Sequence, residues 1–138
     1  MDNKVREIAY EYQLLQAQIE VLSRNLELLS LAKAEMELVK ETLNNLEKDS
    51  KILIPIGAGS YLKGAVTESN KVIVGVGSGY LVEMTTSNAV EFIEKRIEEY
   101  NKLIEKTSST LKLLENRLTQ LAVKVEELQK ASEETSES

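Results

Sequence analysis

The glycine-rich segment GAGSYLKG, at 57–64, is the stretch whose residue types and spacing come nearest to known chemistry. Gly59 and Gly64 have the Gly-x4-Gly spacing of a phosphate-binding loop, which continues with Lys and then Ser or Thr before a helix. Ala65 and Val66 stand in those places, and a strand pattern follows. Leu62 replaces the third glycine of a dinucleotide-binding pattern. We therefore predict hairpin turns here and at GVGSG (75–79), because glycine readily adopts positive φ angles.

Other chemistry has little support in the composition. The chain of 138 residues contains no His and no Cys, the usual acid–base, nucleophilic and metal-binding side chains. The acidic pairs at 98–99, 126–127 and 133–134 are neighbours on predicted helices, so their carboxylates diverge instead of converging on a metal. The net charge of −6 disfavours binding to the phosphate backbone of a nucleic acid. We expect no catalytic residue, no cofactor, no metal and no nucleic-acid partner.

Residues 1–50 contain no Gly and no Pro, and their apolar residues repeat at alternating steps of three and four. This pattern predicts an N-terminal coiled-coil helix. The two registers are Val5, Tyr12, Ile19, Leu26, Lys33, Lys40 and Ile8, Leu15, Leu22, Leu29, Met36, Leu43. We interpret Lys33 and Lys40 as residues that set register or reach out to solvent, and we expect the apolar stripe to shift there towards Ala32 and Val39.

Residues 87–131 repeat the design and predict a C-terminal coiled-coil helix, with Ser87, or Asn88 together with Glu91, capping its start. Its registers are Val90, Ile97, Ile104, Leu111, Leu118, Val125 and Ile93, Tyr100, Thr107, Leu114, Leu121, Leu128. The polar segment SEETSES, at 132–138, is predicted to be a disordered acidic tail.

Residues 51–86 hold all six glycines and the single proline, with β-forming residues around them. They predict four short strands in two successive β-hairpins that form an assembly segment. Pro55 cannot donate to a ladder, so its strand must lie at an edge or carry an irregularity there. The fold class is therefore α+β: a long antiparallel coiled-coil hairpin with two β-hairpins inserted between the helices.

The short path between the helices makes antiparallel pairing natural, with Leu43 near Ile93 and Ile8 near Leu128. Small sheets with two apolar faces are marginal alone. We therefore predict an oligomer that assembles through the β segment, with coiled coils projecting from it.

The free ends of the helices carry apolar residues far from the β segment. Because helix ends fray, we expect these residues to be exposed intermittently and to bind partner proteins. The alternative is that they simply close the coiled coil. They are Val5, Ile8, Tyr12, Leu121, Val125 and Leu128.

The first ten residues show no apolar signal-peptide core, and no run approaches the length of a membrane span. With no Cys present, these features lead us to expect a cytoplasmic protein with no membrane partner.

The segments ILIPIGAGSYLKGAV and VIVGVGSGYLVEMT between two coiled-coil helices resemble the α-class subunit of archaeal-type prefoldin. The resemblance implies a hexamer of two α and four β-class subunits. In that family the strands form a β-barrel body, and the coiled-coil tips hold unfolded proteins without ATP and deliver them to a group II chaperonin. The barrel residues it implies are Ile52, Ile54, Ile56, Val72, Val74, Val76, Tyr80 and Val82.

The resemblance therefore predicts an ATP-independent chaperone subunit, a holdase, and not an enzyme. The alternative function is a structural coiled-coil adaptor that oligomerises through its β segment and holds two specific partners apart. A holdase protects unrelated unfolded proteins from aggregation, whereas an adaptor does not.

Overall fold

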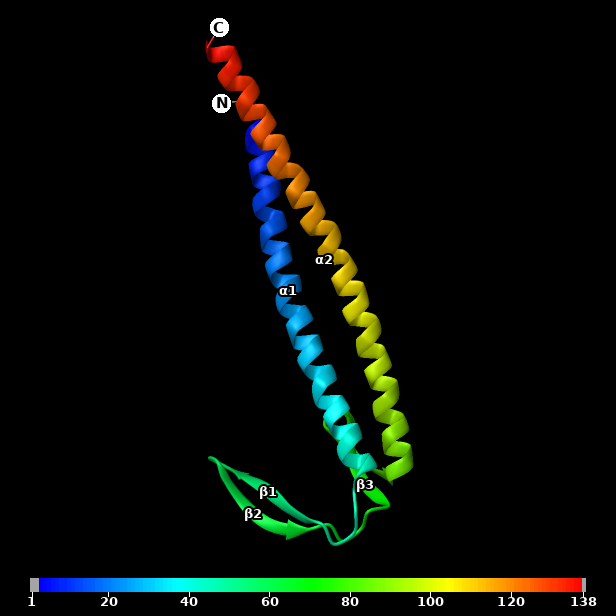
Figure 1. Ribbon diagram of the computed structural model, residues 1–138. Coiled ribbons are helices and arrows are strands. Elements are labelled where there is room, and N and C mark those ends of the chain that lie inside the picture. Colours follow the sequence, from blue (N-terminus) through cyan, green and yellow to red (C-terminus); the bar gives the residue numbers. More distant parts are fainter. Residues whose placement is uncertain (1–2, 138) are drawn as a thin grey trace. The chain divides into compact units, whose positions relative to one another are not determined.

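The computed structural model describes residues 3–137 (Figure 1). One long helix precedes the four strands in the chain and a second long helix follows them, as the sequence predicts. In chain order these are α1 (Asn3–Asn44), β1 (Lys51–Gly57), β2 (Ser60–Ala65), β3 (Lys71–Gly77), β4 (Tyr80–Thr85) and α2 (Thr86–Glu137). The expectations for Met1, Asp2 and Ser138 fall outside the described residues.

The chain divides into two compact units, and each is described by itself. The terminal unit comprises residues 1–31 and 101–138, and the central unit comprises residues 32–100. The described residues of the terminal unit, 3–31 and 101–137, are all helical, whereas the central unit contains the four strands and the adjoining parts of α1 and α2.

The coiled-coil seam is formed by the residues of the predicted registers. Every register position on both helices is buried or half-buried, while most residues between them are exposed. The expected shift of the stripe on α1 was wrong at Val39, which is 45% exposed, whereas Ala32 is half-buried as expected. The seam instead runs through Lys33 and Lys40, whose long aliphatic stems cover apolar surface while their ammonium groups reach outwards. Lys33 Nζ lies 3.8 Å from Glu37 Oε1 in the next turn.

The antiparallel pairing of the helices is confirmed in each unit. In the central unit, Lys40 Nζ on α1 lies 3.3 Å from Glu94 Oε1 on α2. In the terminal unit, Ile8 and Leu128 belong to one apolar cluster, as their expected pairing requires. Arg117 there donates from Nε and from Nη2 to Glu11 Oε1, at 3.2 Å each.

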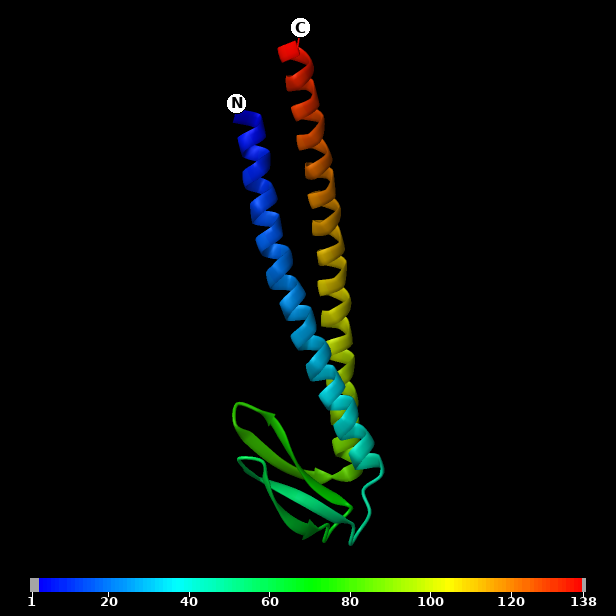
Figure 2. The same ribbon diagram turned by 60° about the vertical axis from the view of Figure 1, so that its left-hand side comes forward.

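The four strands form two separate antiparallel hairpins, β1–β2 and β3–β4, and the structure shows no pairing between them (Figure 2). Both have the same register, with Lys51 opposite Ala65 in the first and Lys71 opposite Thr85 in the second. Each register shifts just before the turn, at Pro55/Gly57 and at Gly75/Gly77. The irregularity expected at Pro55 is therefore confirmed.

The hairpin turns have two central residues with positive φ angles. These are 49° at Ala58 and 72° at Gly59 in the first, and 54° at Ser78 and 80° at Gly79 in the second. Two consecutive positive φ angles match the twist of the flanking strands, which is why such turns join hairpins. The glycine-rich segments are thus turns, as predicted.

The start of α2 differs from the prediction. The backbone N–H of Asn88 donates to Thr85 Oγ1 at 3.1 Å, so Thr85 caps the helix in place of Ser87 or Asn88. The reason is that β4 runs directly into α2, and the chain turns at the end of the ladder. Thr86 Oγ1 also donates to the carbonyl oxygen of Ser69 at 2.6 Å.

The acidic tail also differs from the prediction, because α2 continues to Glu137. No Gly or Pro follows Gly79 in the sequence. Glu, Lys and Ala favour helix, and each residue added to an existing helix gains a backbone hydrogen bond at little cost. A long preceding helix therefore propagates through residues that would not start one.

Candidate functional site

The second hairpin packs on α2 through Arg96. Arg96 Nη2 donates to the carbonyl oxygen of Val76 on β3 at 3.1 Å, and its guanidinium lies 4.9 Å from the centre of the Phe92 ring. Residues of β3 alternate between exposed and half-buried, with Val72, Val74 and Val76 on the covered face. One face of this hairpin is therefore covered within the chain.

The first hairpin is uncovered on both faces. All residues of β1 are exposed, including Ile52, Ile54 and Ile56 at 42%, 43% and 58%. Backbone hydrogen bonds close its base, from Asp49 to Val66 at 2.7 Å and from Val66 to Ser50 at 2.9 Å. Such a surface of large aliphatic side chains is typical of an interface that awaits a partner.

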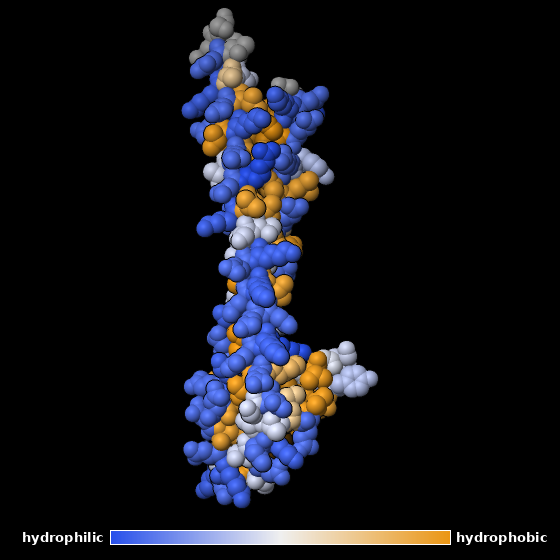
Figure 3. Space-filling model, turned by 90° about the vertical axis from the view of Figure 1, so that its right-hand side faces the viewer, coloured by the Kyte–Doolittle hydropathy of each residue, from blue (hydrophilic) through white to orange (hydrophobic). Residues whose placement is uncertain are grey.

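The eight residues predicted for assembly thus fall into two groups. Ile52, Ile54 and Ile56 are exposed on the first hairpin. On the second, Val72, Val74 and Val76 are half-buried, whereas Tyr80 and Val82 on β4 are 71% and 42% exposed. Each hairpin therefore keeps apolar side chains at its surface, and Figure 3 shows orange apolar patches on one face of the molecule.

The first hairpin also contains a position that only glycine fits without adjustment. A Cβ added at Gly64 on β2 would lie 2.8 Å from Ile54 Cδ1 on β1. Ile54 therefore lies directly over the Gly64 backbone. The equivalent pair on the second hairpin is Val74 with Met84, so this close packing belongs to the first hairpin alone.

The terminal unit brings together most of the residues predicted to bind partner proteins. Ile8, Leu15 and Leu121 form its buried core, with Tyr12, Val125 and Leu128 packed against it. Val5 is half-buried outside this cluster. These side chains meet across the two helices, so in this structure they close the coiled coil.

Two of these residues remain accessible from one side of the coiled coil. Tyr12 and Val125 line a groove of about 480 Å³ together with Ala9, Gln13, Gln16 and Ala122. Because the side chains of Ala9 and Ala122 are small, they do not fill the space between the two helices at this point. Tyr12 and Val125 can therefore be reached while the helices remain paired.

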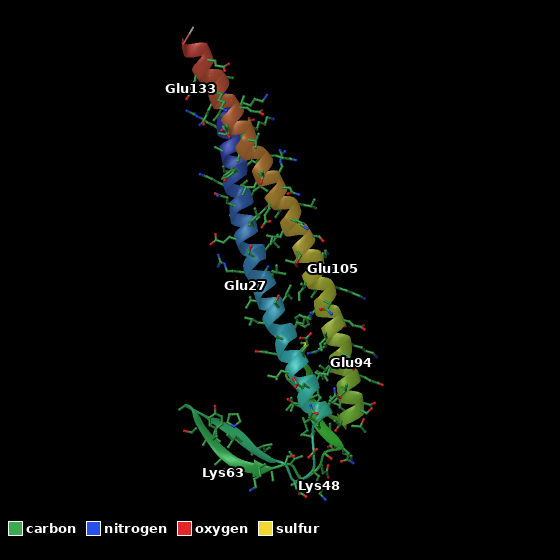
Figure 4. The ribbon with its side chains drawn as sticks, viewed as in Figure 1. Glu27, Lys48, Lys63, Glu94, Glu105 and Glu133 are labelled. Carbon is green, nitrogen blue, oxygen red and sulfur yellow. The ribbon has the colours of Figure 1, made fainter. Side chains whose placement is uncertain are left out.

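The most exposed apolar side chains of the terminal unit escaped the sequence analysis. They are Tyr10, Leu14, Val21, Leu28 and Leu31 on α1, and Leu103, Leu113 and Val123 on α2. A signal was present in the sequence, because Leu14, Val21 and Leu28 recur at intervals of seven outside the two seam registers. Figure 4 shows α1 and α2 of this unit with their side chains, Glu27 and Glu105 among them.

A family model described as "Prefoldin subunit" matches residues 15–131, which is most of the chain. The chain belongs to the prefoldin family. It is similar to prefoldin subunit alpha of Pyrococcus horikoshii, with 49% identity over 98% of this chain and 94% of that protein. It is also similar to prefoldin subunit alpha 1 of Thermococcus kodakarensis, with 50% identity over 70% of this chain and 68% of the relative.

A solved structure supports the prefoldin fold. The crystal structure of the prefoldin beta subunit from Thermococcus strain KS-1 matches with a TM-score of 0.66 and 14% identity. The match covers 92% of this chain and 93% of that one. At 14% identity this similarity supports the fold alone, in which β-structure lies between two long helices in the chain.

Membership of the prefoldin family makes this chain a chaperone subunit of the archaeal α type and not a structural adaptor. Within residues 3–137, no helix is long and apolar enough to span a membrane. The same residues include no group of three or more acidic side chains placed to hold a metal ion.

Proposed function

We propose that this prefoldin subunit is part of an ATP-independent holdase that captures unfolded proteins through its terminal unit. The observation that carries the proposal is the amount of apolar surface that this unit retains. Tyr12 and Val125 line an open groove, and large apolar side chains such as Leu28 and Leu113 are 65% and 70% exposed. Unfolded proteins expose apolar side chains in different sequences and arrangements. Hydrophobic attraction is non-directional, so an apolar surface can bind them without a specific sequence.

The residues at the ends of the helices are proposed as client-binding groups. When the helix ends are closed, Ile8, Tyr12, Leu121, Val125 and Leu128 pack together and Val5 is half-buried outside their cluster. All six become available when the ends separate. Helix ends open at low free-energy cost. Each contact is weak, but several coiled coils that hold one client raise its affinity through effective concentration.

Assembly is proposed to take place through the hairpins of the central unit. Two copies of this chain would combine with four β-class subunits, and their strands would close a β-barrel body. The exposed isoleucines of β1 support this proposal, because an isolated two-stranded hairpin is marginally stable and gains from a partner sheet. The complex would act in the cytoplasm and pass its clients to a group II chaperonin.

The proposal can be tested on the assembled complex. The variant Ile8→Ser, Val125→Ser, Leu128→Ser is compared with wild type in the light scattering of two unrelated denatured proteins, without nucleotide. We expect weaker protection and an unchanged native mass. If protection of both proteins stays at the wild-type level, these residues do not bind clients.

A matched control alters three other seam residues of the terminal unit. Ile19, Leu26 and Leu111 are half-buried between the helices and lie further along the chain from its ends. The variant Ile19→Ser, Leu26→Ser, Leu111→Ser also replaces three apolar seam residues by Ser but leaves the ends intact. Equal loss of protection in both variants would show that general loosening is responsible, and not the proposed residues.

A further inference from the structure

The second hairpin is attached to α2 at two points. At its base β4 runs directly into α2, where the backbone N–H of Asn88 donates to Thr85 Oγ1 at 3.1 Å. Near its turn, Arg96 Nη2 donates to the carbonyl oxygen of Val76 on β3 at 3.1 Å. The turn end of β3 therefore cannot leave its place without breaking a hydrogen bond to a long helix.

The second hairpin also has one face covered within the chain. Val72, Val74 and Val76 on β3 are half-buried, and so is Met84 on β4. Removing apolar side chains from water stabilises the element that carries them. The second hairpin therefore gains stability in the subunit alone, before any partner binds.

The first hairpin is closed by backbone hydrogen bonds at its base, but its strands are uncovered. The bonds run from Asp49 to Val66 at 2.7 Å and from Val66 to Ser50 at 2.9 Å. Every residue of β1 is exposed, and so is every residue of β2 apart from Gly64. The side-chain atoms nearest to a Cβ at Gly64 belong to Ile54 of the same hairpin. The first hairpin therefore covers Gly64 by itself.

This difference in attachment predicts a difference in stability between two hairpins of the same register. A two-stranded hairpin without cover is marginally stable in water. Segments with few buried apolar side chains and solvent-exposed backbone hydrogen bonds open at low free-energy cost. Opening the first hairpin exposes little additional apolar surface, whereas opening the second exposes the valines of β3 and breaks the bond from Arg96.

We propose that the first hairpin folds only on assembly, whereas the second hairpin is already folded in the free subunit and is kept so by Arg96. The inference rests on the proposed assembly through the hairpins, because a neighbouring sheet is what would stabilise the first one. A partner that binds only the folded form stabilises it by mass action. The cost of folding the first hairpin is then subtracted from the affinity of assembly.

Amide hydrogen exchange of the full chain tests the difference between the hairpins. Protection of residues 51–65 and 71–85 is measured by mass spectrometry, in the chain diluted to a monomer and in the complex with β-class subunits. In the monomer, we expect protection of 51–65 to be about tenfold or more below that of 71–85, the ratio that one hydrogen bond from a charged donor gives. In the complex we expect this difference to disappear. Equal protection of the two segments in the monomer would overturn the inference.

Two matched turn variants test whether the folding of each hairpin limits assembly. Ala58 and Ser78 occupy equivalent turn positions, with φ angles of 49° and 54°, and a glycine follows each of them. Asn adopts such angles more readily than most residues, so Ala58→Asn and Ser78→Asn each stabilise one turn.

The two variants should differ in their effect on the complex. We expect Ala58→Asn to lower the dissociation constant by about twofold or more, because it raises the folded fraction of the first hairpin. Ser78→Asn should leave the constant unchanged, because the second hairpin is already folded. Amide exchange of each monomeric variant checks that its own turn is stabilised. Equal effects of the two variants on assembly would overturn the inference.

The role of Arg96 is tested by removing the attachment of the second hairpin near its turn. In an Arg96→Ala background, Ser78→Asn should strengthen assembly as Ala58→Asn does in the wild type. If Ser78→Asn has no effect there either, Arg96 does not keep the second hairpin folded.

The exchange experiment separates failure of the inference from failure of the proposed assembly. If the complex forms but neither hairpin gains protection in it, the proposed assembly through the hairpins is refuted. If both hairpins are equally protected in the monomer and both gain protection in the complex, the assembly proposal stands and the inference alone fails.

Discussion

Arg96 Nη2 on α2 donates a hydrogen bond of 3.1 Å to the carbonyl oxygen of Val76 on β3, twenty residues earlier in the chain. The same guanidinium lies over the Phe92 ring. A hydrogen bond from a charged donor thus holds one hairpin against the helix that follows it, and the ring contact lies within α2. Among the described side chains, none makes such a hydrogen bond to the first hairpin. The two hairpins are therefore supported unequally within one chain.

Replacing Arg96 should loosen the second hairpin alone. Arg96→Ala removes a hydrogen bond from a charged donor together with a cation–π contact, which together contribute about 1–3 kcal/mol. We expect faster amide hydrogen exchange in β3 and β4 and no change in β1 and β2. Arg24→Ala, at an exposed ion pair, is the control. Equal acceleration in both hairpins would contradict this role for Arg96.

The Gly64–Ile54 contact can be tested by rescue. Gly64→Ala places a Cβ about 2.8 Å from Ile54 Cδ1, so Ile54 must move and assembly through the first hairpin should weaken. Ile54→Val removes Cδ1, so the double variant should assemble better than Gly64→Ala alone. Assembly is measured by native mass spectrometry. Gly75→Ala, whose Cβ would meet Leu81 Cδ2 at 3.7 Å, is the control that should assemble normally.

Charge on the strands should prevent assembly without unfolding the helices. Ile54→Lys with Val74→Lys places one ammonium group on each hairpin, where burial in a partner sheet would be costly. We expect the native mass of the complex to be lost while the helical circular dichroism signal remains. Thr67→Lys with Asn70→Lys adds the same charge at exposed loop positions and should assemble. A normal complex from the strand variant would refute the barrel proposal.

Removing a lysine from the seam should raise stability. Lys40 occupies an apolar register position and is 38% exposed at its side chain, and its ion pair with Glu94 is partly solvated. Such pairs contribute about 0–1 kcal/mol, whereas a leucine here would bury additional apolar area. Lys40→Leu should therefore raise the melting temperature, with Glu41→Leu on the exposed side of α1 as the control. A lower melting temperature would mean that the ion pair outweighs packing.

The elements of the fold were predictable because each is encoded locally. The heptad repeats predicted the seam along both helices, as far as Leu43 on α1 and from Val90 on α2. The glycines in the segments 57–59 and 77–79 predicted both turns. The cap at Thr85 was missed because it depends on β4 running directly into α2, which is a tertiary effect. The helical tail was missed because composition describes an isolated segment and not the end of a long helix.

The candidate surfaces were harder to predict than the fold. The residues assigned to the helix ends proved to be those that the seam buries, since the same apolar character serves both purposes. The exposed row of Leu14, Val21 and Leu28 was recognisable only once the exposure of these side chains was known. Thr110 and Leu114 line one groove with Ala17 and Val21 through antiparallel pairing, which no pattern within one helix reveals.

The matching registers of the two hairpins give the subunit two equivalent small sheets for the proposed assembly. Lys51 and Lys71 begin equivalent ladders, and each hairpin is a two-stranded sheet with open edges. A chain with one such hairpin can offer only half as many edges to its neighbours. In the proposed assembly, removing residues 51–70 would place Lys71 where Lys51 begins its ladder, and one copy would then connect fewer subunits.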